Sequence, residues 1–333
     1  MTDRAGRWFA ALRAEGESVD IRYGFIPDGS ATPSWTFLPH DRFDGMGGLL
    51  HLLRDAGVDV TPPVTRRRPP APVLRSFRAF LGQRRRRPAR WDMFDDDWRP
   101  RQPSRSRPVA VAWTILSESA TSEVLRRADT CGVSLNSWLL WCLHHAIRDE
   151  LDSDRGSAWM VPVNMRGAVR LRRDTANHLG FLIVPVRDDD RPRDVHQRVR
   201  HDLRRGIDVG SWYALAAGRS AGTRLLQDAL AAGARRWRAL GTVSNLGAWH
   251  LPQTVPSGAW LFCPPATRFQ PLALGAVITG GRLALTMQSH PALNDEAAIV
   301  ERWLRALETS IAIAPRPVPV VRRRPRVIVV RRP

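Results

Sequence analysis

The strongest constraint on the fold is the repeated change between strand-like and helical patterns of apolar residues along positions 108–312. Short apolar runs such as 158–163 and 272–278 are typical of buried strands, whereas residues 136–151 place apolar side chains on one face at helical spacing. Helices interleaved with strands are typical of α/β or α+β proteins with mixed sheets. The 333 residues allow a sizeable core, which we expect to be divided between two subdomains.

The same patterns predict the individual elements. We expect strands at residues 19–26, 34–39, 108–116, 158–163, 177–186, 241–247, 272–278 and 283–288. We expect helices at residues 5–15, 46–56, 73–82, 117–129, 136–151, 191–205, 212–240 and 294–312. The pair Gly280-Gly281 between the last two strands is a strong hairpin signal.

One strand-turn-helix unit near the N-terminus carries residues suited to catalysis. The expected strand 34–39 leads into the turn His40-Asp-Arg-Phe-Asp44-Gly45, and an apolar helix follows. A histidine has an ordinary pKa of roughly 6.5, which suits proton abstraction near neutral pH. Asp44 is placed to form a structural ion pair, and Gly45 permits a tight exit into the helix. Because an ordinary polar turn can contain the same residues, this short pattern needs support from elsewhere in the chain.

The charge is extreme, with a net value of +19, and all 51 basic residues are Arg. An arginine-rich chain without lysine indicates the drift of a very GC-rich genome rather than selection of a phosphate-binding surface. Much of the excess lies in residues 66–90 and 316–333. We interpret the first run as a solvated connector, with a contact surface for an acidic carrier protein or a phosphate-bearing substrate as the alternative. No nucleic-acid motif accompanies these runs, so a nucleic-acid-binding protein is only a third and weaker alternative.

Cysteine usage and hydropathy indicate which cellular compartment and which kinds of site to expect. Cys131, Cys142 and Cys263 are too few and too scattered for a disulfide framework or a zinc site, so we expect no metal and a reducing compartment. No apolar run in the sequence suits a signal peptide or reaches the roughly 18 residues of a membrane span. We therefore expect a soluble, cytoplasmic protein without a transmembrane segment.

Five segments occur in an order that is more informative than any one of them. They are GVSLNSWLLWCL (132–143), WMVPVNMRG (159–167), NHLGFLIVPV (177–186), VSNLG (243–247) and PLALGAVITGGRLALTMQ (271–288). This succession resembles the C-terminal half of the coenzyme-A-dependent acyltransferase superfamily, which includes chloramphenicol acetyltransferase, wax-ester synthases/diacylglycerol acyltransferases and the condensation domains of peptide synthetases. The family signature His-His-x-x-x-Asp-Gly lies upstream of these segments. PHDRFDG at 39–45 occupies that place, with Pro39 in the position of the first His.

The resemblance implies a fold and a reaction. The fold would be a chloramphenicol acetyltransferase-like two-layer α/β sandwich with mixed sheets. The reaction would transfer an acyl group from an acyl-coenzyme A or acyl-carrier-protein thioester, as co-substrate, to an alcohol or amine, with His40 as general base. No bound cofactor is expected. The acceptor would be a small molecule or a lipid, and an acyl carrier protein is a possible partner.

The resemblance also implies roles for residues around His40. Ser244 or Asn245, or backbone N–H groups, would stabilise the negative charge on the carbonyl oxygen. Asp44 would pair with an arginine of the facing half, for which Arg166 is the best candidate. Both Ser244 and Asn245 also suit ordinary turn chemistry, and Arg166 also suits an exposed position.

A second histidine pair competes with His40. His144-His145-Ala-Ile-Arg-Asp149 matches the signature more completely and fails only at Glu150, which replaces the Gly. The expected helix 136–151 has no Gly or Pro to make the required turn, whereas the histidine of this family follows a strand. We therefore assign the base to His40, and we interpret His144 and His145 as the polar end of a core-facing helix.

The chain departs from the family before the signature, because only 39 residues precede His40. We divide it into a shortened N-terminal subdomain (1–60), an Arg/Pro-rich crossover linker (61–107), a C-terminal acyltransferase-like subdomain (108–314) and a basic Pro-rich tail expected to be disordered (315–333). A shortened first half would leave the site open, or completed by a second copy of the chain. The alternative function is therefore a non-catalytic binding or scaffold protein whose Arg-rich segments contact an acidic partner.

Overall fold

A computed structural model describes residues 6–63, 72–83, 91, 110–151, 156–168, 175–218, 221–237, 239–252, 257–293 and 299–312. Most of the expected linker and all of the expected tail at 315–333 lie outside these residues. Within the described part of the chain, no helix is both long and apolar enough to cross a membrane.

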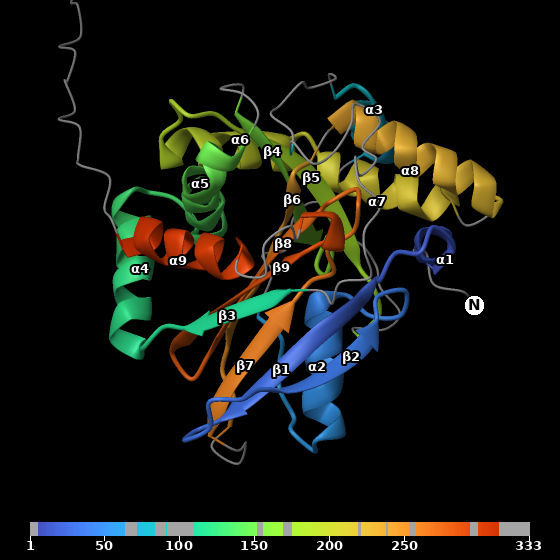
Figure 1. The fold of residues 1–333 in the computed structure, drawn as a ribbon. Coiled ribbons are helices and arrows are strands. Elements are labelled where there is room, and N and C mark those ends of the chain that lie inside the picture. Colours follow the sequence, from blue (N-terminus) through green and yellow to red (C-terminus); the bar gives the residue numbers. More distant parts are fainter. Residues whose placement is uncertain are drawn as a thin grey trace, which may run out of the picture.

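The elements mostly follow the predicted order (Figure 1). The strands are β1 (Asp20–Pro27), β2 (Ser34–Pro39), β3 (Val111–Ile115), β4 (Ser157–Asn164), β5 (Leu179–Val186), β6 (Gly241–Trp249), β7 (Gly258–Cys263), β8 (Leu272–Thr279) and β9 (Arg282–Ser289). The α-helices are α1 (Gly6–Ala14), α2 (Gly45–Asp55), α3 (Val73–Leu81), α4 (Glu118–Thr130), α5 (Leu135–Ile147), α6 (Pro192–Arg204), α7 (Ile207–Ala217), α8 (Thr223–Trp237) and α9 (Ile299–Ala312).

The larger sheet has six strands in the order β3-β9-β8-β6-β4-β5. Strands β8, β6 and β4 run parallel, whereas the outer pairs are antiparallel. The predicted hairpin at Gly280-Gly281 joins β8 to β9, and both glycines have positive φ, which the tight turn requires. Mixed pairing with interspersed helices confirms the expected mixed α/β fold class.

The main core contains side chains of this sheet together with side chains of α4, α5, α6 and α9. Figure 1 shows α5 and α9 side by side, and the two helices pack against each other. Large aromatic side chains fill this core, because Trp138, Trp159 and Trp303 are each less than 2% exposed. Fully buried tryptophans contribute strongly to stability through their large apolar area.

The smaller sheet has three antiparallel strands in the order β2-β1-β7. Its third strand, β7, lies more than 200 positions after β1 and was not predicted from the sequence. Strand β7 also packs on the larger sheet, where the Thr286 hydroxyl donates a hydrogen bond to the carbonyl oxygen of Phe262. This strand therefore joins the N-terminal hairpin to the rest of the molecule.

Helix α2 contributes Met46, Leu49, Leu50 and Leu53 to a second core that also contains residues of both sheets. In Figure 1 α2 lies beside β1 and β2. The burial of this apolar face fixes the position of the helix and, with it, the turn that precedes the helix.

One predicted helix and one predicted strand differ most clearly from the structure. The helix expected at 212–240 is two helices, α7 and α8. Helix α7 ends at Ala217. The C-cap residue Gly218 lies against the Trp8 indole, which donates to the carbonyl oxygen of Leu215 and leaves no room for a β-carbon on Gly218. The strand expected to end at Gly247 continues to Trp249 through a β-bulge, for which Gly247 supplies a positive φ.

Replacing Gly275 by Ala tests how tightly β7 is seated on the larger sheet. A β-carbon at this position would overlap the carbonyl oxygen of Phe262, a backbone group that cannot move unless β7 shifts. We expect Gly275→Ala to lower the free energy of unfolding by about 1–3 kcal/mol, as overpacked cores do, measured by urea denaturation. Gly6→Ala is the control, because a β-carbon there has no neighbour within 4 Å. Equal unfolding midpoints for the two variants would contradict this packing.

Candidate active site

The turn that carries His40 is closed by backbone hydrogen bonds. Strand β2 ends at Pro39, whose carbonyl oxygen accepts the N–H groups of Arg42 and Phe43 at 3.0 and 3.1 Å. Asp44 then has an extended backbone and caps the first turn of α2. The sequence Pro-x-x-x-Phe-Asp-Gly thus folds locally into a strand end, a tight turn and a capped helix start. His40 lies at the strand end, where the sequence predicted it.

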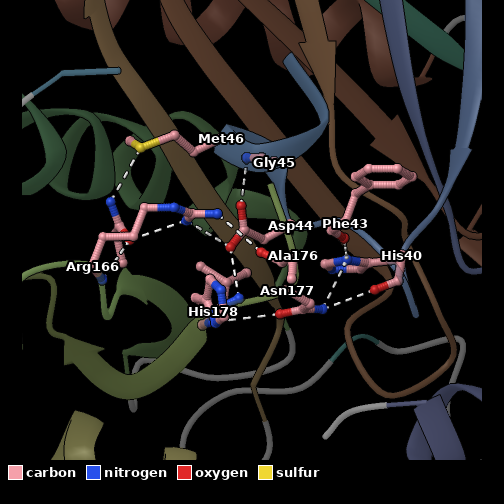
Figure 2. Close-up of polar contacts among 12 residues, drawn as sticks. His40, Phe43, Asp44, Gly45, Met46, Arg166, Ala176, Asn177 and His178 are labelled. Carbon is pink, nitrogen blue, oxygen red and sulfur yellow. Dashed lines mark hydrogen bonds and ion pairs between the residues drawn. The ribbon is translucent and has the colours of Figure 1, made fainter. Parts of the chain in front are cut away.

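The protonation of His40 follows from its hydrogen bonds. Its Nδ1 lies 2.8 Å from the carbonyl oxygen of Phe43, which can only accept, so Nδ1 carries the proton in the neutral ring. The lone pair is then on Nε2, the nitrogen that can take a proton from a substrate. Asn177 donates its amide to the main-chain oxygen of His40 at 2.8 Å and so holds the backbone of the same residue. Figure 2 shows both contacts.

The surroundings of His40 favour its neutral form. The side chain is partly buried, and the Phe9 ring of α1 lies 4.5 Å from the imidazole, measured between centroids. Burial lowers the pKa of His40 from its ordinary value of 6.5, although the hydrogen bond to Phe43 and the charge of Asp44 act in the opposite direction. A neutral imidazole with a free Nε2 is the form that a general base requires.

The carboxylate of Asp44 is fully buried and accepts hydrogen bonds on both oxygens. Oδ1 accepts the N–H of Gly47 at 2.6 Å, which caps α2. Oδ2 accepts the N–H of His178 at 2.7 Å and a guanidinium N–H of Arg166 at 2.8 Å (Figure 2). A buried carboxylate is stable only with such partners, so Asp44 ties α2 to two other segments of the chain.

Arg166 follows strand β4 and has an 11% exposed side chain. Besides Asp44, its guanidinium donates to the side-chain oxygen of Asn164 at 3.2 Å and to the carbonyl oxygen of Ala176 at 2.9 Å. The structure thus brings Asp44 and Arg166 together as an ion pair. Asn164 was not singled out from the sequence, although it lies two residues before Arg166 in the VPVNMR segment.

Space, rather than backbone conformation, requires glycine at the start of α2. Gly45 is helical and does not have a positive φ. A β-carbon on Gly45 would lie 2.6 Å from the Phe262 ring, and one on Gly47 would overlap the carbonyl oxygen of Thr175. The expected reason for Gly45, a tight exit into the helix, is therefore replaced by close packing against β7.

Residues 175–178, which we call the 175–178 segment, pack against the turn that carries His40. Ala176 forms an isolated β-bridge with Phe43, Asn177 binds His40, and the N–H of His178 binds Asp44. The sequence pattern predicted only a strand at 177–186. The available signal was the polar pair Asn177-His178 immediately before an apolar run.

Ser244 and Asn245 lie on β6, and both side chains are partly exposed. The amide of Asn245 donates to the side-chain oxygen of Asn136 at 2.7 Å, and its oxygen accepts the N–H of Gly247 at 2.8 Å. An amide group has two N–H donors, so a second one remains beyond the bond to Asn136. A β-carbon on Gly45 would lie 2.8 Å from Cδ2 of the adjacent Leu246, which places this part of β6 beside the start of α2.

The competing pair His144-His145 lies within α5. His144 is fully buried, with Nδ1 2.8 Å from the Ser157 hydroxyl and Nε2 2.8 Å from an oxygen of Asp188. His145 Nδ1 contacts the carbonyl oxygen of Trp141 in its own helix at 2.9 Å. The helical context predicted for this pair is therefore observed, although α5 ends at Ile147 and a short 3-10 helix follows.

Further features of the described chain concern metals and thiols. The described residues contain no group of three or more His, Cys, Asp or Glu side chains arranged to hold a metal ion. Cys131, Cys142 and Cys263 are free thiols, and the last two are buried.

Replacing Asp44 tests the buried ion pair. We expect Asp44→Ala to lower the free energy of unfolding by about 3–5 kcal/mol, because Arg166 would keep a buried charge without its carboxylate partner. Urea or thermal denaturation measures this loss.

Asp41→Ala is a matched control in the same turn. Asp41 pairs with Arg13, but their side chains are 29% and 39% exposed. Exposed pairs contribute about 0–1 kcal/mol, so this variant should be close to the wild type. Equal losses of stability in the two variants would show that burial of Asp44 does not matter.

Comparison with known proteins supplies the fold. No protein-family model and no curated protein sequence matches the chain. The structure resembles the trichothecene 15-O-acetyltransferase of Fusarium sporotrichioides at 14% identity and a TM-score of 0.51, over 91% of this chain and 74% of the other. It also resembles the first condensation domain of the CDA synthetase at 15% identity and a TM-score of 0.51, over 89% of this chain and 67% of the other. The chain therefore has the chloramphenicol acetyltransferase-like fold shared by condensation domains and acetyltransferases, as the ordered motifs implied.

Proposed function

We propose that the protein is an acyltransferase that moves an acyl group from a thioester to an alcohol or amine, with His40 as the general base. The observation that carries this proposal is the hydrogen bond from His40 Nδ1 to the carbonyl oxygen of Phe43, which leaves Nε2 as a proton acceptor. The donor would be an acyl-coenzyme A or an acyl-carrier-protein thioester. The acceptor would be a small molecule or a lipid.

In the proposed reaction one proton moves from the acceptor to His40 and then from His40 to the leaving sulfur. As the acceptor oxygen or nitrogen forms a bond to the thioester carbonyl carbon, Nε2 of His40 takes the acceptor's proton. The tetrahedral intermediate then breaks its C–S bond, and the imidazolium returns the proton to the departing sulfur. The products are an ester or amide and a free thiol, and His40 is neutral again. No covalent acyl-enzyme is needed.

The negative charge of the intermediate needs hydrogen-bond donors, and we propose Ser244 or Asn245 for this role. Asn245 has a second amide N–H besides the one bonded to Asn136, and Ser244 has a hydroxyl. A donor of this kind contributes about 10²–10³ in rate when it is aimed at the developing oxyanion. The closeness of Leu246 to Gly45 favours Ser244, because side chains two positions apart share one face of a strand and β6 lies beside the helix that follows the His40 turn.

Asp44, Arg166 and Gly45 would act on the reaction through the turn. The ion pair and the capped helix start hold the backbone from residue 40 to 47, and close packing at Gly45 sets that helix against β7. A base must lie within hydrogen-bond reach of its proton, so small displacements of the turn would slow the reaction.

The two similar structures support group transfer by their names, since one is an O-acetyltransferase and the other is a condensation domain. The proposal includes a homo-oligomer in which a second copy of the chain completes the site.

Thiol release tests the proposal. Purified protein should release free thiol from at least one acyl-coenzyme A or acyl-carrier-protein thioester in the presence of a panel of alcohols and amines. His40→Ala should reduce this release by about 10²-fold or more, because general base catalysis contributes about 10²–10⁴ in rate. A thiol-reactive dye measures the rate.

His145→Ala is the matched control, because His145 bonds only within its own helix in the described contacts. It should retain the activity. Full activity in His40→Ala would disprove the assignment of the base, and loss of activity in His145→Ala alone would transfer it to α5. Absence of thiol release with every donor would favour the non-catalytic alternative.

A further inference from the structure

We propose that Asn177 is a positioning residue for His40, which fixes the backbone of the base and disfavours the positively charged form of its imidazole. This inference rests on the proposed function for its catalytic consequence. Its structural part, the control of the imidazole by Asn177, stands on contacts alone. No feature of the sequence pattern assigned Asn177 a role.

The orientation of the Asn177 amide is determined by its two backbone neighbours. Its nitrogen faces the carbonyl oxygen of His40 at 2.8 Å, and that oxygen can only accept. Its oxygen faces the N–H of Leu179 at 3.4 Å, and that group can only donate. A flipped amide would lose both contacts, so the NH₂ group is directed at His40.

The same NH₂ group lies 3.4 Å from Nδ1 of His40. Because Nδ1 already donates to Phe43 at 2.8 Å, the amide cannot gain a second strong bond there. Its positive hydrogens instead face Nδ1–H, so the amide disfavours a positive charge on the ring, whereas the bond to Phe43 selects Nδ1 as the protonated nitrogen. An amide in this place disfavours a positive ring, whereas a carboxylate in the same place would favour it.

Asn177 is itself held from both sides. The carbonyl oxygen of Ala176 accepts a hydrogen bond from Arg166 at 2.9 Å, and the N–H of His178 donates to Asp44 at 2.7 Å. Asn177 therefore lies between the two backbone groups that bind the Asp44–Arg166 pair. Figure 2 shows the amide between this ion pair and His40. The Asp44–Arg166 pair is thus connected to His40 in two ways, through the backbone of the turn and through Asn177.

Titration of His40 tests the structural part without any need for activity. The imidazole Cε1–H signal, assigned with His40→Ala, should give a pKa below 6.5 in the wild type. Asn177→Asp should raise this pKa by about one unit or more, because a carboxylate within about 4–6 Å favours the charged ring. Gln197→Glu on the exposed side of α6 adds the same charge away from the turn and should leave the titration unchanged. An unchanged titration in Asn177→Asp would overturn the inference.

Kinetics test the catalytic part. In Asn177→Asp the acidic limb of the pH profile of kcat/KM should move to higher pH by the same amount as the pKa of His40. Asn177→Leu, which keeps the size but removes the donor, should lower kcat about 10-fold or more with a small change in KM. Asn177→Gln should not restore kcat fully, because its longer side chain cannot keep the 2.8 Å contact.

The outcomes separate the inference from the proposed function. If the wild type releases no thiol but the titration moves as described, the proposed function fails and the control of His40 by Asn177 stands. If the wild type is active and neither kcat in Asn177→Leu nor the acidic limb in Asn177→Asp changes, the inference fails and the proposed function stands. Circular dichroism and thermal unfolding of each variant verify that it is folded, and the near-isosteric Asn177→Asp retains the test if Asn177→Leu unfolds.

Discussion

The buried carboxylate of Asp44 is the interaction on which the candidate site depends. It accepts the first-turn N–H of α2, the N–H of His178 and the guanidinium of Arg166, and therefore joins three segments that are far apart in sequence. A buried charge of this kind costs free energy unless every partner is present. The Asp44 carboxylate fixes the geometry of the site, because it determines where β2 ends, where α2 begins and where Arg166 lies.

The geometry around His40 follows from that arrangement. Asp44 holds the turn from the helix side, the 175–178 segment holds it from the other side, and β7 fixes α2 through close packing at Gly45. The result is a partly buried imidazole with one nitrogen committed to Phe43. The neutral ring is maintained by burial, and its orientation is maintained by main-chain contacts that side-chain motion cannot easily break.

The sequence predicted the local parts of this arrangement well. The His40 turn and the hairpin at Gly280-Gly281 have signatures a few residues long, because local hydrogen bonds and backbone conformations produce them, whereas capping of α2 by Asp44 was not predicted. Strand β7 was missed, since its pairing with β1 depends on contacts between distant parts of the chain. Asn177 was missed for the same reason. The requirement for Gly45 also depends on a distant residue, because it comes from the Phe262 ring packed against it.

The central claim is that this turn presents His40 as a neutral imidazole with its proton on Nδ1. The ¹⁵N chemical shifts of the ring nitrogens, measured at neutral pH and assigned by their loss in His40→Ala, report this directly. The account predicts a protonated Nδ1 and an unprotonated Nε2 with the shift of a free or weakly bonded nitrogen. A ring protonated on Nε2 alone, or on both nitrogens, would contradict it.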